Sequence, residues 1–368
     1  MQKLLRKMGI DPEVIEDAVR KDLDAMPGVT GSGFTATALA GGASVRGFVR
    51  LDLNGSSEVK SMVLMVLSDP DPAKGIEEVM EEGAIKELPF INVHRHLEGS
   101  GISVPELYHY NTDRGILYLE DCGRVHLRQA AESDDPSYKE KAYKRAIDEL
   151  VKIHVDASQR KSEEFLGFMV RFDRKLLRWE LDHFTEFAIE ARFPNALTEE
   201  DREEFARHFE RITEELREGP YTLQHRDYML DNLMLVGGGV KVLDFQDALM
   251  GPVMYDMACL LYDRDTSTLL GDDLIRELVE YYIDKLEERA GQKQDRELLW
   301  RNFDLCVIHR MLKVVGRFHF IDIVKKRPEY LDFVPHMLPA ITKYLVRSEQ
   351  DSELLGIIRK YLPELRGV

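Results

Sequence analysis

One segment of the chain carries two carboxylates and an amide at a spacing suited to phosphoryl transfer. Asp227 stands in a His-Arg-Asp sequence, Asn232 follows five residues later, and Asp244 comes after an apolar stretch. Phosphoryl transfer requires positioning and charge neutralisation rather than covalent work by the protein. A carboxylate beside the acceptor hydroxyl orients it or accepts its proton, while hard oxygen ligands hold Mg²⁺ against the phosphates. The three side chains supply these groups in this chain order.

Aspartate and asparagine are also common in turns, so Asp-x-x-x-x-Asn alone does not identify a site. The chemical interpretation is favoured by a second acidic motif, Asp244-Phe245-Gln246-Asp247, at hairpin distance after an apolar strand. A loop followed by a pair of strands brings both sets of ligands to one point. The sequence therefore predicts an enzyme that uses ATP and Mg²⁺ to phosphorylate a hydroxyl group.

The elements around these motifs change from strands to helices along the chain. Alternating apolar residues predict strands at 35–39, 45–53, 59–67, 106–110 and 115–119. Helical spacing predicts helices at 1–26, 75–97, 138–155, 165–191 and 199–217. A short strand-rich interval covers 222–247, and helices continue to the C-terminus. This order predicts an α+β fold with two lobes.

Three parts of the chain follow from this layout. Residues 1–30 form an N-terminal helical extension, and residues 31–120 form a small nucleotide-binding lobe of about five antiparallel strands and one helix. Residues 121–368 form a larger, mostly helical lobe with the catalytic loop and the acceptor site.

The composition of the chain disfavours some classes of binding partner. The chain has 50 Lys and Arg against 67 Asp and Glu, a formal charge of −17, which disfavours nucleic acid and membrane surfaces as partners. No apolar run approaches the length needed to cross a bilayer. The cysteines, Cys122, Cys259 and Cys306, lack metal-ligand spacing. We expect a cytoplasmic protein that is a monomer or a weak dimer.

The motifs together resemble the aminoglycoside phosphotransferase and choline kinase superfamily. The resemblance rests on His225–Asn232, Asp244–Asp247, Gly251-Pro252 and Tyr255–Ala258. Within the superfamily, the chain is most similar to bacterial anomeric kinases of N-acetylmuramate and N-acetylglucosamine, which act in cell-wall sugar recycling. That similarity adds Ala43–Arg50, Leu176–Phe187 and Arg310–Gly316. The resemblance runs from about residue 40 to the C-terminus and implies a protein-kinase-like fold and a small-molecule sugar substrate.

By position, the resemblance implies that Asp227 is the catalytic base and that Asn232 and Asp244 are the magnesium ligands. Asp247 is a candidate helper at the metal or at the acceptor. His225 and Asp256 are expected to support the catalytic loop, Asp256 from inside the helical lobe. The alternative for Asp256 is an ordinary helix N-cap.

The small lobe departs from the protein-kinase pattern, in which a lysine on the third strand pairs with the phosphates and a helix glutamate holds it. The third strand reads Ser-Met-Val-Leu-Met-Val-Leu over 61–67 and contains no lysine there, and Phe90 occupies the glutamate position. Loss of both partners is consistent, because a lone buried charge would be costly. We expect Ser44, Arg46 and the backbone amides of 41–45 to neutralise the phosphates instead. A plain hairpin and a solvated strand face are the alternatives.

Two further regions complete the predicted site. The joint between the lobes resembles a hinge, in which backbone groups near Glu120 and Cys122 bond the adenine edge. On the acceptor side, Glu180 is the best candidate for binding the sugar, although charged helices are more often solvated faces. The same ambiguity applies to a basic stripe formed at i, i+4 spacing by His309, Lys313 and Arg317.

Three other functions remain open. The acceptor could be an aminoglycoside, choline or homoserine, as in other members of the superfamily. A pseudokinase that binds nucleotide without turnover is favoured by the missing lysine but disfavoured by Asp227, Asn232 and Asp244. Phosphorylation of a protein is disfavoured, because the sequence contains no recognisable activation segment.

Overall fold

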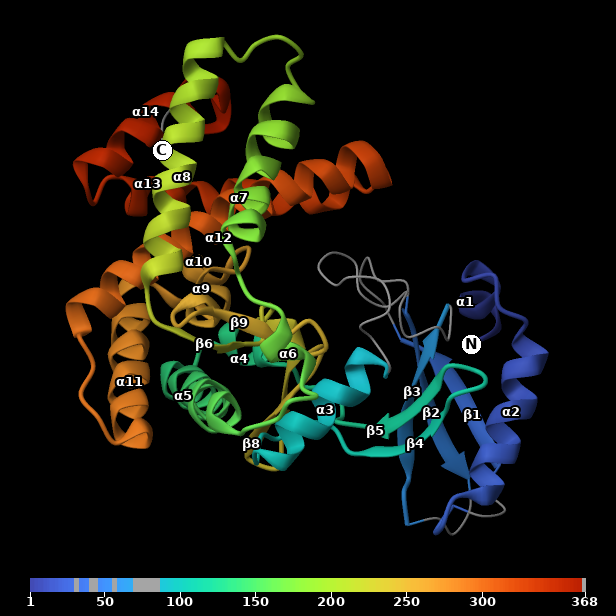
Figure 1. The fold of residues 1–368 in the computed structure, drawn as a ribbon. Helices are drawn as coiled ribbons and strands as arrows, with labels where there is room; N and C mark the ends of the chain where they lie inside the picture. Colours follow the sequence, from blue (N-terminus) through green and yellow to red (C-terminus); the bar gives the residue numbers. More distant parts are fainter. Residues whose placement is uncertain (30–32, 40–45, 55–57, 69–86, 366–368) are drawn as a thin grey trace. The chain divides into compact units, whose positions relative to one another are not determined.

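The computed structural model describes residues 1–368 except 30–32, 40–45, 55–57, 69–86 and 366–368 (Figure 1). The chain divides into two compact units. The sheet unit contains Met1–Ile91, Ser103–Arg124 and Lys241–Leu243, and the helical unit contains Asn92–Ile102, Val125–Val240 and Asp244–Val368. Asp227, Asn232 and Asp244 therefore all belong to the helical unit.

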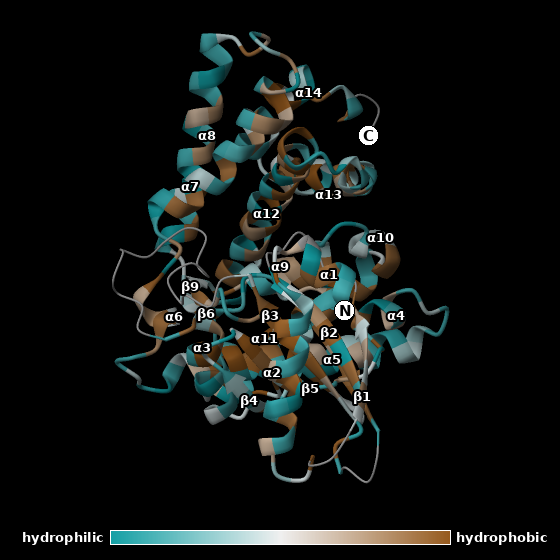
Figure 2. Ribbon diagram, turned by 90° about the vertical axis from the view of Figure 1, so that its right-hand side faces the viewer, coloured by the Kyte–Doolittle hydropathy of each residue, from teal (hydrophilic) through white to brown (hydrophobic). Residues whose placement is uncertain are grey.

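A five-stranded antiparallel sheet forms the centre of the sheet unit, with strand order β1-β2-β3-β5-β4. The strands are β1 (Gly33–Ala38), β2 (Arg46–Asn54), β3 (Ser61–Leu67), β4 (Leu107–Asn111) and β5 (Ile116–Glu120). Across the middle of the sheet, Val49 lies opposite Leu64, which lies opposite Tyr118. All three are fully buried, and β3 is apolar along most of its length (Figure 2). The prediction of about five antiparallel strands in an α+β fold is confirmed.

Two helices, rather than the single predicted one, precede this sheet. They are α1 (Gln2–Lys7) and α2 (Pro12–Ala25). Gly9 has a left-handed backbone with a φ of +76°, and the Asp11 side chain accepts a hydrogen bond from the Glu13 N–H at 3.0 Å. Pro12 has no N–H to continue an earlier helix, so it starts a new one. The prediction of one helix over 1–26 is therefore wrong at this break.

Both N-terminal helices pack on the sheet. Val19 and Leu23 of α2 belong to the same buried core as the sheet residues. A Cβ atom on Gly47 would clash with the Sδ atom of Met8. Gly47 therefore lets the α1 end of the chain approach the backbone of β2 closely.

The third strand and the following helix are apolar at the positions that carry an ion pair in protein kinases. β3 contains no lysine. Helix α3 spans Pro89–Gly99, and its second residue, Phe90, is buried with 6% of its surface exposed. The predicted helix over 75–97 agrees with α3 at its C-terminal end, while its first part falls in 75–86, outside the described residues.

The helical unit contains the larger part of α3, from Asn92 on, and eleven further described α-helices. They are α4 (Leu127–Ala131), α5 (Pro136–Lys152), α6 (Leu166–Met169), α7 (Arg174–His183), α8 (Glu199–Glu218), α9 (Tyr255–Tyr262), α10 (Thr266–Leu270), α11 (Asp272–Ala290), α12 (Arg296–Lys325), α13 (Val334–Leu345) and α14 (Glu349–Tyr361). Two π-helical segments, η2 (Ile153–Ala157) and η3 (Phe184–Glu190), extend α5 and α7. The short 3-10 helices are η4 (Leu230–Asn232), η5 (Pro328–Phe333) and η6 (Pro363–Leu365).

The helix predicted over 165–191 is interrupted between α6 and α7. There the chain runs alongside β9 (Leu249–Pro252): the Phe172 N–H donates to the Met250 carbonyl at 2.8 Å, and the Met250 N–H donates to the Val170 carbonyl at 3.0 Å. Asp173 then caps α7 by accepting from the Leu176 N–H at 2.8 Å. Pairing with a distant strand overrides the local helical pattern.

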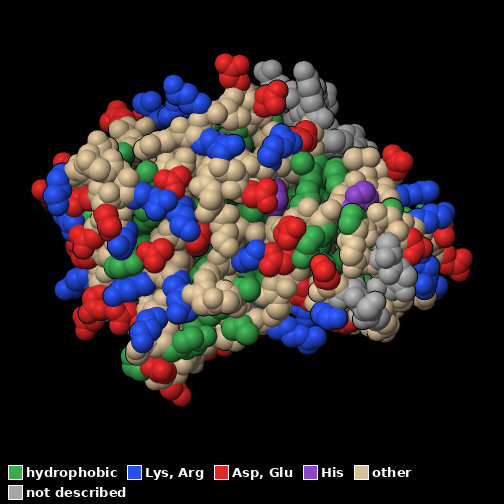
Figure 3. All heavy atoms as spheres, turned by 90° about the horizontal axis from the view of Figure 1, so that it is seen from below, with side chains coloured by type: hydrophobic (Ala, Val, Ile, Leu, Met, Phe, Trp, Pro, Cys, Tyr) green, Lys and Arg blue, Asp and Glu red, His purple; other side chains and the backbone are tan. Residues whose placement is uncertain are grey.

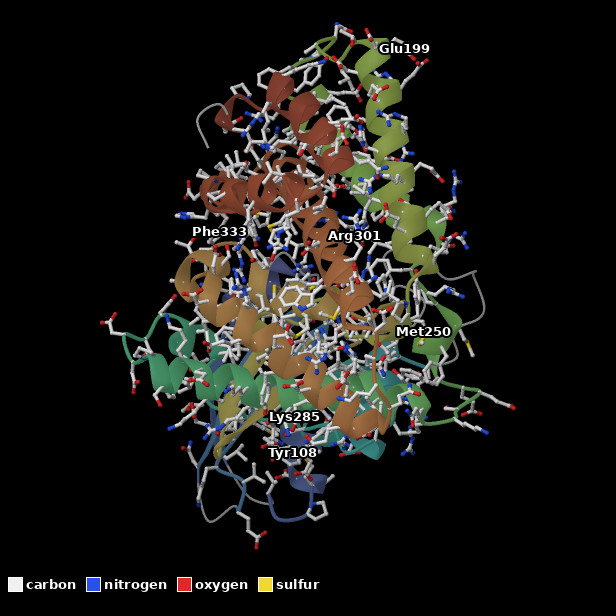
Figure 4. All side chains as sticks on the ribbon, turned by 90° about the vertical axis from the view of Figure 1, so that its left-hand side faces the viewer. Tyr108, Glu199, Met250, Lys285, Arg301 and Phe333 are labelled. Carbon is white, nitrogen blue, oxygen red and sulfur yellow. The ribbon has the colours of Figure 1, made fainter. Side chains whose placement is uncertain are left out.

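Helix α12 is the central helix of this unit and packs against α7, η3, α9 and α13. Figure 4 labels Arg301 in its N-terminal part. Gly316 lies against the backbone of His183 and Phe184, so closely that a Cβ atom there would be 2.5 Å from the His183 carbonyl group. A glycine at this point therefore lets α12 and the α7–η3 segment touch backbone to backbone.

Two short sheets position the motifs. β6 (Tyr221–Gln224) pairs antiparallel with β9, and β7 (Leu233–Val236) pairs with β8 (Gly239–Val242). The first motif therefore lies in the connection from β6 to β7, and the second lies between β8 and β9.

The surface mixes charges of both signs. On the face in Figure 3, Lys and Arg side chains lie interspersed with Asp and Glu side chains. In the described part of the chain, no helix has both the length and the apolar character that a membrane crossing requires. Cys122, Cys259 and Cys306 are free and buried.

Candidate active site

The connection from β6 to β7 carries the candidate reaction centre. Arg226 adopts a left-handed backbone with a φ of +78°, which is uncommon for a residue with a long side chain. The Asn232 Nδ2 atom donates to the Asp227 carbonyl at 2.9 Å. This hydrogen bond joins the two ends of the loop and fixes the direction of the Asn232 amide.

Asp256 holds the backbone of the loop. Its fully buried carboxylate accepts from the N–H groups of His225 at 2.6 Å and of Arg226 at 2.9 Å. His154 of η2 lies 3.5 Å from the same carboxylate. The N-cap residue of α9 is Met254, so Asp256 is not an ordinary N-cap. Its carboxylate oxygens instead accept hydrogen bonds from two backbone N–H groups of the loop.

Asp227 has a carboxylate that is ionised and about half accessible. Its side chain is 46% exposed, and its Oδ1 atom lies 3.5 Å from Nη1 of Arg310. Burial of the other half raises the pKa of Asp227, but the positive charges of Arg310, Lys313 and Arg226 outweigh it, and the pKa lies below its ordinary value. The Asp227 N–H donates to Nδ1 of His225 at 3.3 Å. A group in this state can orient a hydroxyl group.

Alternating charges link Arg310 back to the loop. Arg310 lies 3.5 Å from Asp263, and Asp263 accepts from Nε of Arg264 at 2.7 Å. Arg264 in turn forms an ion pair with Asp231, which also pairs with Arg128 at 3.0 Å. Because most of these side chains are at least partly buried, screening by water is reduced. The loop is therefore fixed by side chains from α4, α12 and the end of α9.

Gln246 connects the two carboxylates of the second motif. Its Nε2 atom donates to Asp244 Oδ1 at 3.1 Å and to Asp247 Oδ2 at 2.8 Å. Asp244 has a left-handed backbone with a φ of +58°, and the neighbouring Phe245 is fully buried. The Oε1 atom of Gln246 is buried without a hydrogen-bond partner in the described part of the chain. Two carboxylates thus approach a single nitrogen atom.

Glu180 is the centre of a buried charge cluster. Its carboxylate is fully buried. It accepts from Lys313 Nζ at 2.6 Å, from Arg226 Nη2 at 2.9 Å and from the Tyr255 hydroxyl at 3.4 Å. His309 Nδ1 lies 3.9 Å away. The side chain predicted to bind the acceptor is therefore occupied by protein groups.

The basic stripe predicted on α12 is not a solvated face. His309 is fully buried, and its Nε2 atom shares a hydrogen bond of 3.0 Å with the Leu177 carbonyl. Lys313 pairs with Glu180, and the guanidinium of Arg317 lies 4.9 Å from the centre of the Phe320 ring. Glu180 and Lys313 thus face each other across α7 and α12.

The residues predicted to bind the nucleotide belong to the sheet unit. Ser44 lies outside the described residues, and Arg46 is half-buried at the start of β2. Glu120 accepts from the Glu106 N–H at 3.0 Å and pairs with Lys241. Burial raises the pKa of the Cys122 thiol to about 12, so this thiol is neutral.

Arg50 is a further cation of the sheet unit with a defined partner. It is 6% exposed and pairs with Asp121 at 2.7 Å. Burial raises the pKa of Asp121, but the side-chain hydrogen bonds of Ser61 and Arg50 lower it below its ordinary value. Arg50 therefore fixes the segment that contains Glu120 and Cys122, rather than lying on a solvated strand face.

Sequence reasoning missed three residues at the candidate site. Arg310 contacts Asp227 from a helix 83 residues away, Gln246 joins two carboxylates, and Arg226 bonds Glu180. All three stand inside stretches that carried the resemblance, which was the only available signal. Sequence spacing cannot place a guanidinium against a carboxylate in another helix.

The fold and these motifs define a class of enzyme. The phosphotransferase enzyme family matches residues 35–295, a span that contains both motifs. The chain therefore belongs to this family, and the predictions of a phosphotransferase and of the superfamily resemblance are confirmed.

Two similar proteins carry names that specify a substrate. The chain is 30% identical to the N-acetylmuramate/N-acetylglucosamine kinase of Pseudomonas aeruginosa over 279 residues, which cover 75% of this chain and 78% of the relative. It is 28% identical to the kinase of the same name from Neisseria meningitidis over 281 residues, which cover 76% and 80%.

A solved structure extends the comparison to the fold. An amicoumacin kinase in complex with AMP-PNP and Ca²⁺ covers 93% of this chain and 96% of its own, with a TM-score of 0.58 and 12% identity. The likeness at this identity concerns the fold, and it agrees with the predicted kinase-like architecture.

Proposed function

We propose that this enzyme transfers the γ-phosphoryl group of ATP, bound with Mg²⁺, to the anomeric hydroxyl of an N-acetylated amino sugar in cell-wall sugar recycling. The observation that carries the proposal is an ionised, half-exposed Asp227 in a loop fixed by Asp256, in a chain whose relatives are named as kinases of such sugars. Asp227 is the proposed catalytic base, which orients the acceptor hydroxyl and accepts its proton as the new bond to phosphorus forms.

The second motif fits a divalent cation. Gln246 donates to Asp244 and to Asp247 through one nitrogen atom, so both carboxylates approach one point, and their hard oxygen atoms are the ligands that Mg²⁺ prefers. The described side chains form no group of three or more His, Cys, Asp or Glu that could hold a metal. We assign Asn232 and Asp244 as ligands of the Mg²⁺ ion bound with the nucleotide, with Asp247 as helper. Bound Mg²⁺ would neutralise phosphate charge.

The nucleotide side of the proposal rests on the sheet unit. Arg46 and Ser44 are proposed to bind the phosphates, and backbone groups near Glu120 and Cys122 are proposed to bond adenine. The fixed Arg50–Asp121 pair supports the second assignment, because it holds the Glu120–Cys122 segment in place. Arg46→Ala should raise the Michaelis constant for ATP, and an unchanged value would remove Arg46 from the site.

A parallel acceptor screen tests the function. N-acetylmuramate, N-acetylglucosamine, an aminoglycoside, choline and homoserine are each incubated with ATP and Mg²⁺, and ADP release and phosphorylated product are measured. Asp227→Asn is run beside the parent enzyme, with ATP-induced thermal stabilisation as the check that its fold and nucleotide binding are intact. We expect turnover of an amino sugar to its 1-phosphate by the parent enzyme only.

Other outcomes would replace parts of the proposal. Turnover of choline, homoserine or the aminoglycoside alone would keep the phosphotransferase and change the acceptor. Stabilisation by ATP without product from any acceptor would favour the pseudokinase, which the lysine-free β3 makes the second candidate.

A further inference from the structure

Glu180 is placed where it contacts three elements of the helical unit at once. It belongs to α7, and its partners are Lys313 of α12, Tyr255 of α9 and Arg226 of the loop before Asp227. Lys313 and Arg226 both donate to the same atom, Oε1. Neither cation is fully exposed, since the side chains retain 19% and 14% of their accessible surface.

The cations of the cluster stabilise the negative charge of Glu180 in a region that water does not reach. A buried carboxylate without partners would take up a proton. Burial raises the pKa of Glu180, but Lys313, Arg226 and His309 outweigh it and bring the pKa to about 2. Glu180 is therefore a fixed negative charge in the interior, and it cannot meet a substrate where it lies.

The loop residue that Glu180 holds is conformationally unfavourable. Arg226 has a φ of +78°, a left-handed conformation that is unfavourable for a non-glycine residue because its Cβ atom crowds the following carbonyl oxygen. Its N–H donates to Asp256, its carbonyl accepts from Cys259 Sγ at 3.3 Å, and its side chain donates to Glu180. Three partners thus stabilise the backbone of the residue directly before Asp227.

We propose that Glu180 is a positioning residue: by holding Arg226 in this backbone conformation, it sets the direction of the Asp227 carboxylate from α7. This assignment rests on the proposed role of Asp227 and replaces direct acceptor binding as the function of Glu180. It follows from geometry, because a peptide unit separates the fixed Arg226 from Asp227 and a small rotation there moves the carboxylate. A misplacement of about 1 Å at a reaction centre can cost about 100-fold in rate.

Glu180→Gln tests the inference. Glutamine keeps the size of the side chain but removes the charge, which leaves Arg226 and Lys313 competing for a neutral amide. The matched control is Glu215→Gln in α8, because Glu215 also pairs with an α12 cation, Arg301, at 2.9 Å. We expect Glu180→Gln to lower kcat by about 10- to 100-fold with KM for ATP nearly unchanged, while Glu215→Gln keeps kcat.

Combination with Asp227→Asn separates positioning from a purely structural role. If Glu180 acts through Asp227, then Glu180→Gln should change the residual rate of Asp227→Asn by less than about threefold, because the group it positions has gone. Glu180→Asp, which keeps the charge, should recover part of kcat. Multiplicative losses, or equal kcat values for the Glu180→Gln and Glu215→Gln variants, would overturn the inference.

A second pair of variants covers the case in which Glu180→Gln does not fold. Arg226→Lys shortens the side chain and removes the guanidinium, whereas Lys313→Met removes the other partner of Glu180 and leaves the Arg226 contact. We expect the larger fall in kcat for Arg226→Lys, and equal falls would contradict the inference. Absence of turnover by the parent enzyme would count against the proposed function instead.

Discussion

Asp227 in the loop at 225–232 and Glu180 in the helix pair α7–α12 are both carboxylates flanked by cations, but only Asp227 is exposed. The Asp227 side chain is 46% exposed and the Glu180 side chain is fully buried. Nearby cations lower the pKa of both groups below the ordinary value. Asp227 is therefore able to contact a substrate, whereas Glu180 is able to act only on its neighbours. A perturbed pKa near a candidate centre does not by itself distinguish these roles.

The two regions also differ in the range of their contacts. Within the loop, Asn232 contacts a residue five positions away, and the motif spacing already brings the groups together. In the helix pair, Glu180 contacts Lys313, which is 133 residues later in the chain. The loop therefore combines one contact between near neighbours in sequence with distant supports such as Asp256, whereas the Glu180–Lys313 contact depends entirely on how two helices pack.

The largest expected effect comes from the exposed carboxylate. Asp227→Asn keeps the size of the side chain but removes its ability to accept a proton, so kcat should fall by about 100- to 10,000-fold. KM for ATP and the unfolding midpoint in urea should change little. If Asp227→Asn lowered kcat by less than Glu180→Gln did in the same amino-sugar assay, the buried carboxylate would be the more important of the two for catalysis.

The next largest effect is expected from Asp256, the buried carboxylate that holds the backbone of the loop. Asp256→Ala removes an acceptor from the N–H groups of His225 and Arg226, so the free energy of unfolding should fall by about 3 kcal/mol. Urea unfolding followed by circular dichroism measures this loss. Asp113→Ala, in the exposed turn between β4 and β5, is the control. A loss equal to that of the control would mean that the loop holds its shape without Asp256.

The strands and most helices could be predicted because their patterns are local. The pattern of apolar and β-favouring residues gave the five strands to within two residues at every end. The exceptions have physical causes outside the local pattern. Pro12 starts a second helix within 1–26, and Phe172 pairs with Met250 of β9 where a continuous helix was predicted.

The candidate site was predictable only in part for the same reason. The residue types and spacing of the Asp227 and Asp244 motifs suggested a phosphotransferase, and the family match confirms that class. The burial of Glu180 could not be predicted, because helical charge periodicity is the same for a solvated face and for a face paired with another helix. The contact of Arg310 with Asp227 likewise depends on how α12 crosses the unit.

A smaller effect tests the packing of the helix pair itself. Gly316→Ala would place a methyl group against the His183 carbonyl and the Phe184 nitrogen, and backbone atoms cannot move aside cheaply. We expect a loss of about 1–3 kcal/mol in the free energy of unfolding. Gly356→Ala in α14 is the matched control, because nothing lies within 4 Å of the added carbon there, and it should stabilise by roughly 0.5–1 kcal/mol. Equal changes in the free energy of unfolding for the two variants would mean that α12 and the α7–η3 segment do not make close backbone contact at Gly316.

The last effect is a change in the slope of stability against pH, which between pH 6.5 and 4 includes a contribution from His309 of the helix pair. Burial lowers the pKa of His309 to about 4, although the nearby charge of Glu180 opposes the shift. The unfolded chain therefore takes up a proton near pH 6.5, and the folded chain does so only near pH 4. The free energy of unfolding falls as pH decreases through this interval, with a slope of about 1.4 kcal/mol per pH unit from this residue.

His309→Gln isolates that contribution. Glutamine retains a donor for the Leu177 carbonyl but does not titrate, so the slope between pH 6 and 4.5 should decrease by about 1 kcal/mol per unit. His319, whose pKa burial also lowers to about 4, continues to supply a slope in the variant and serves as the internal reference. Glu180 loses its own contribution only below pH 4.5, because its pKa lies at about 2. An unchanged slope in the His309→Gln variant would mean that water reaches His309, and then the charge of Glu180 would be screened as well.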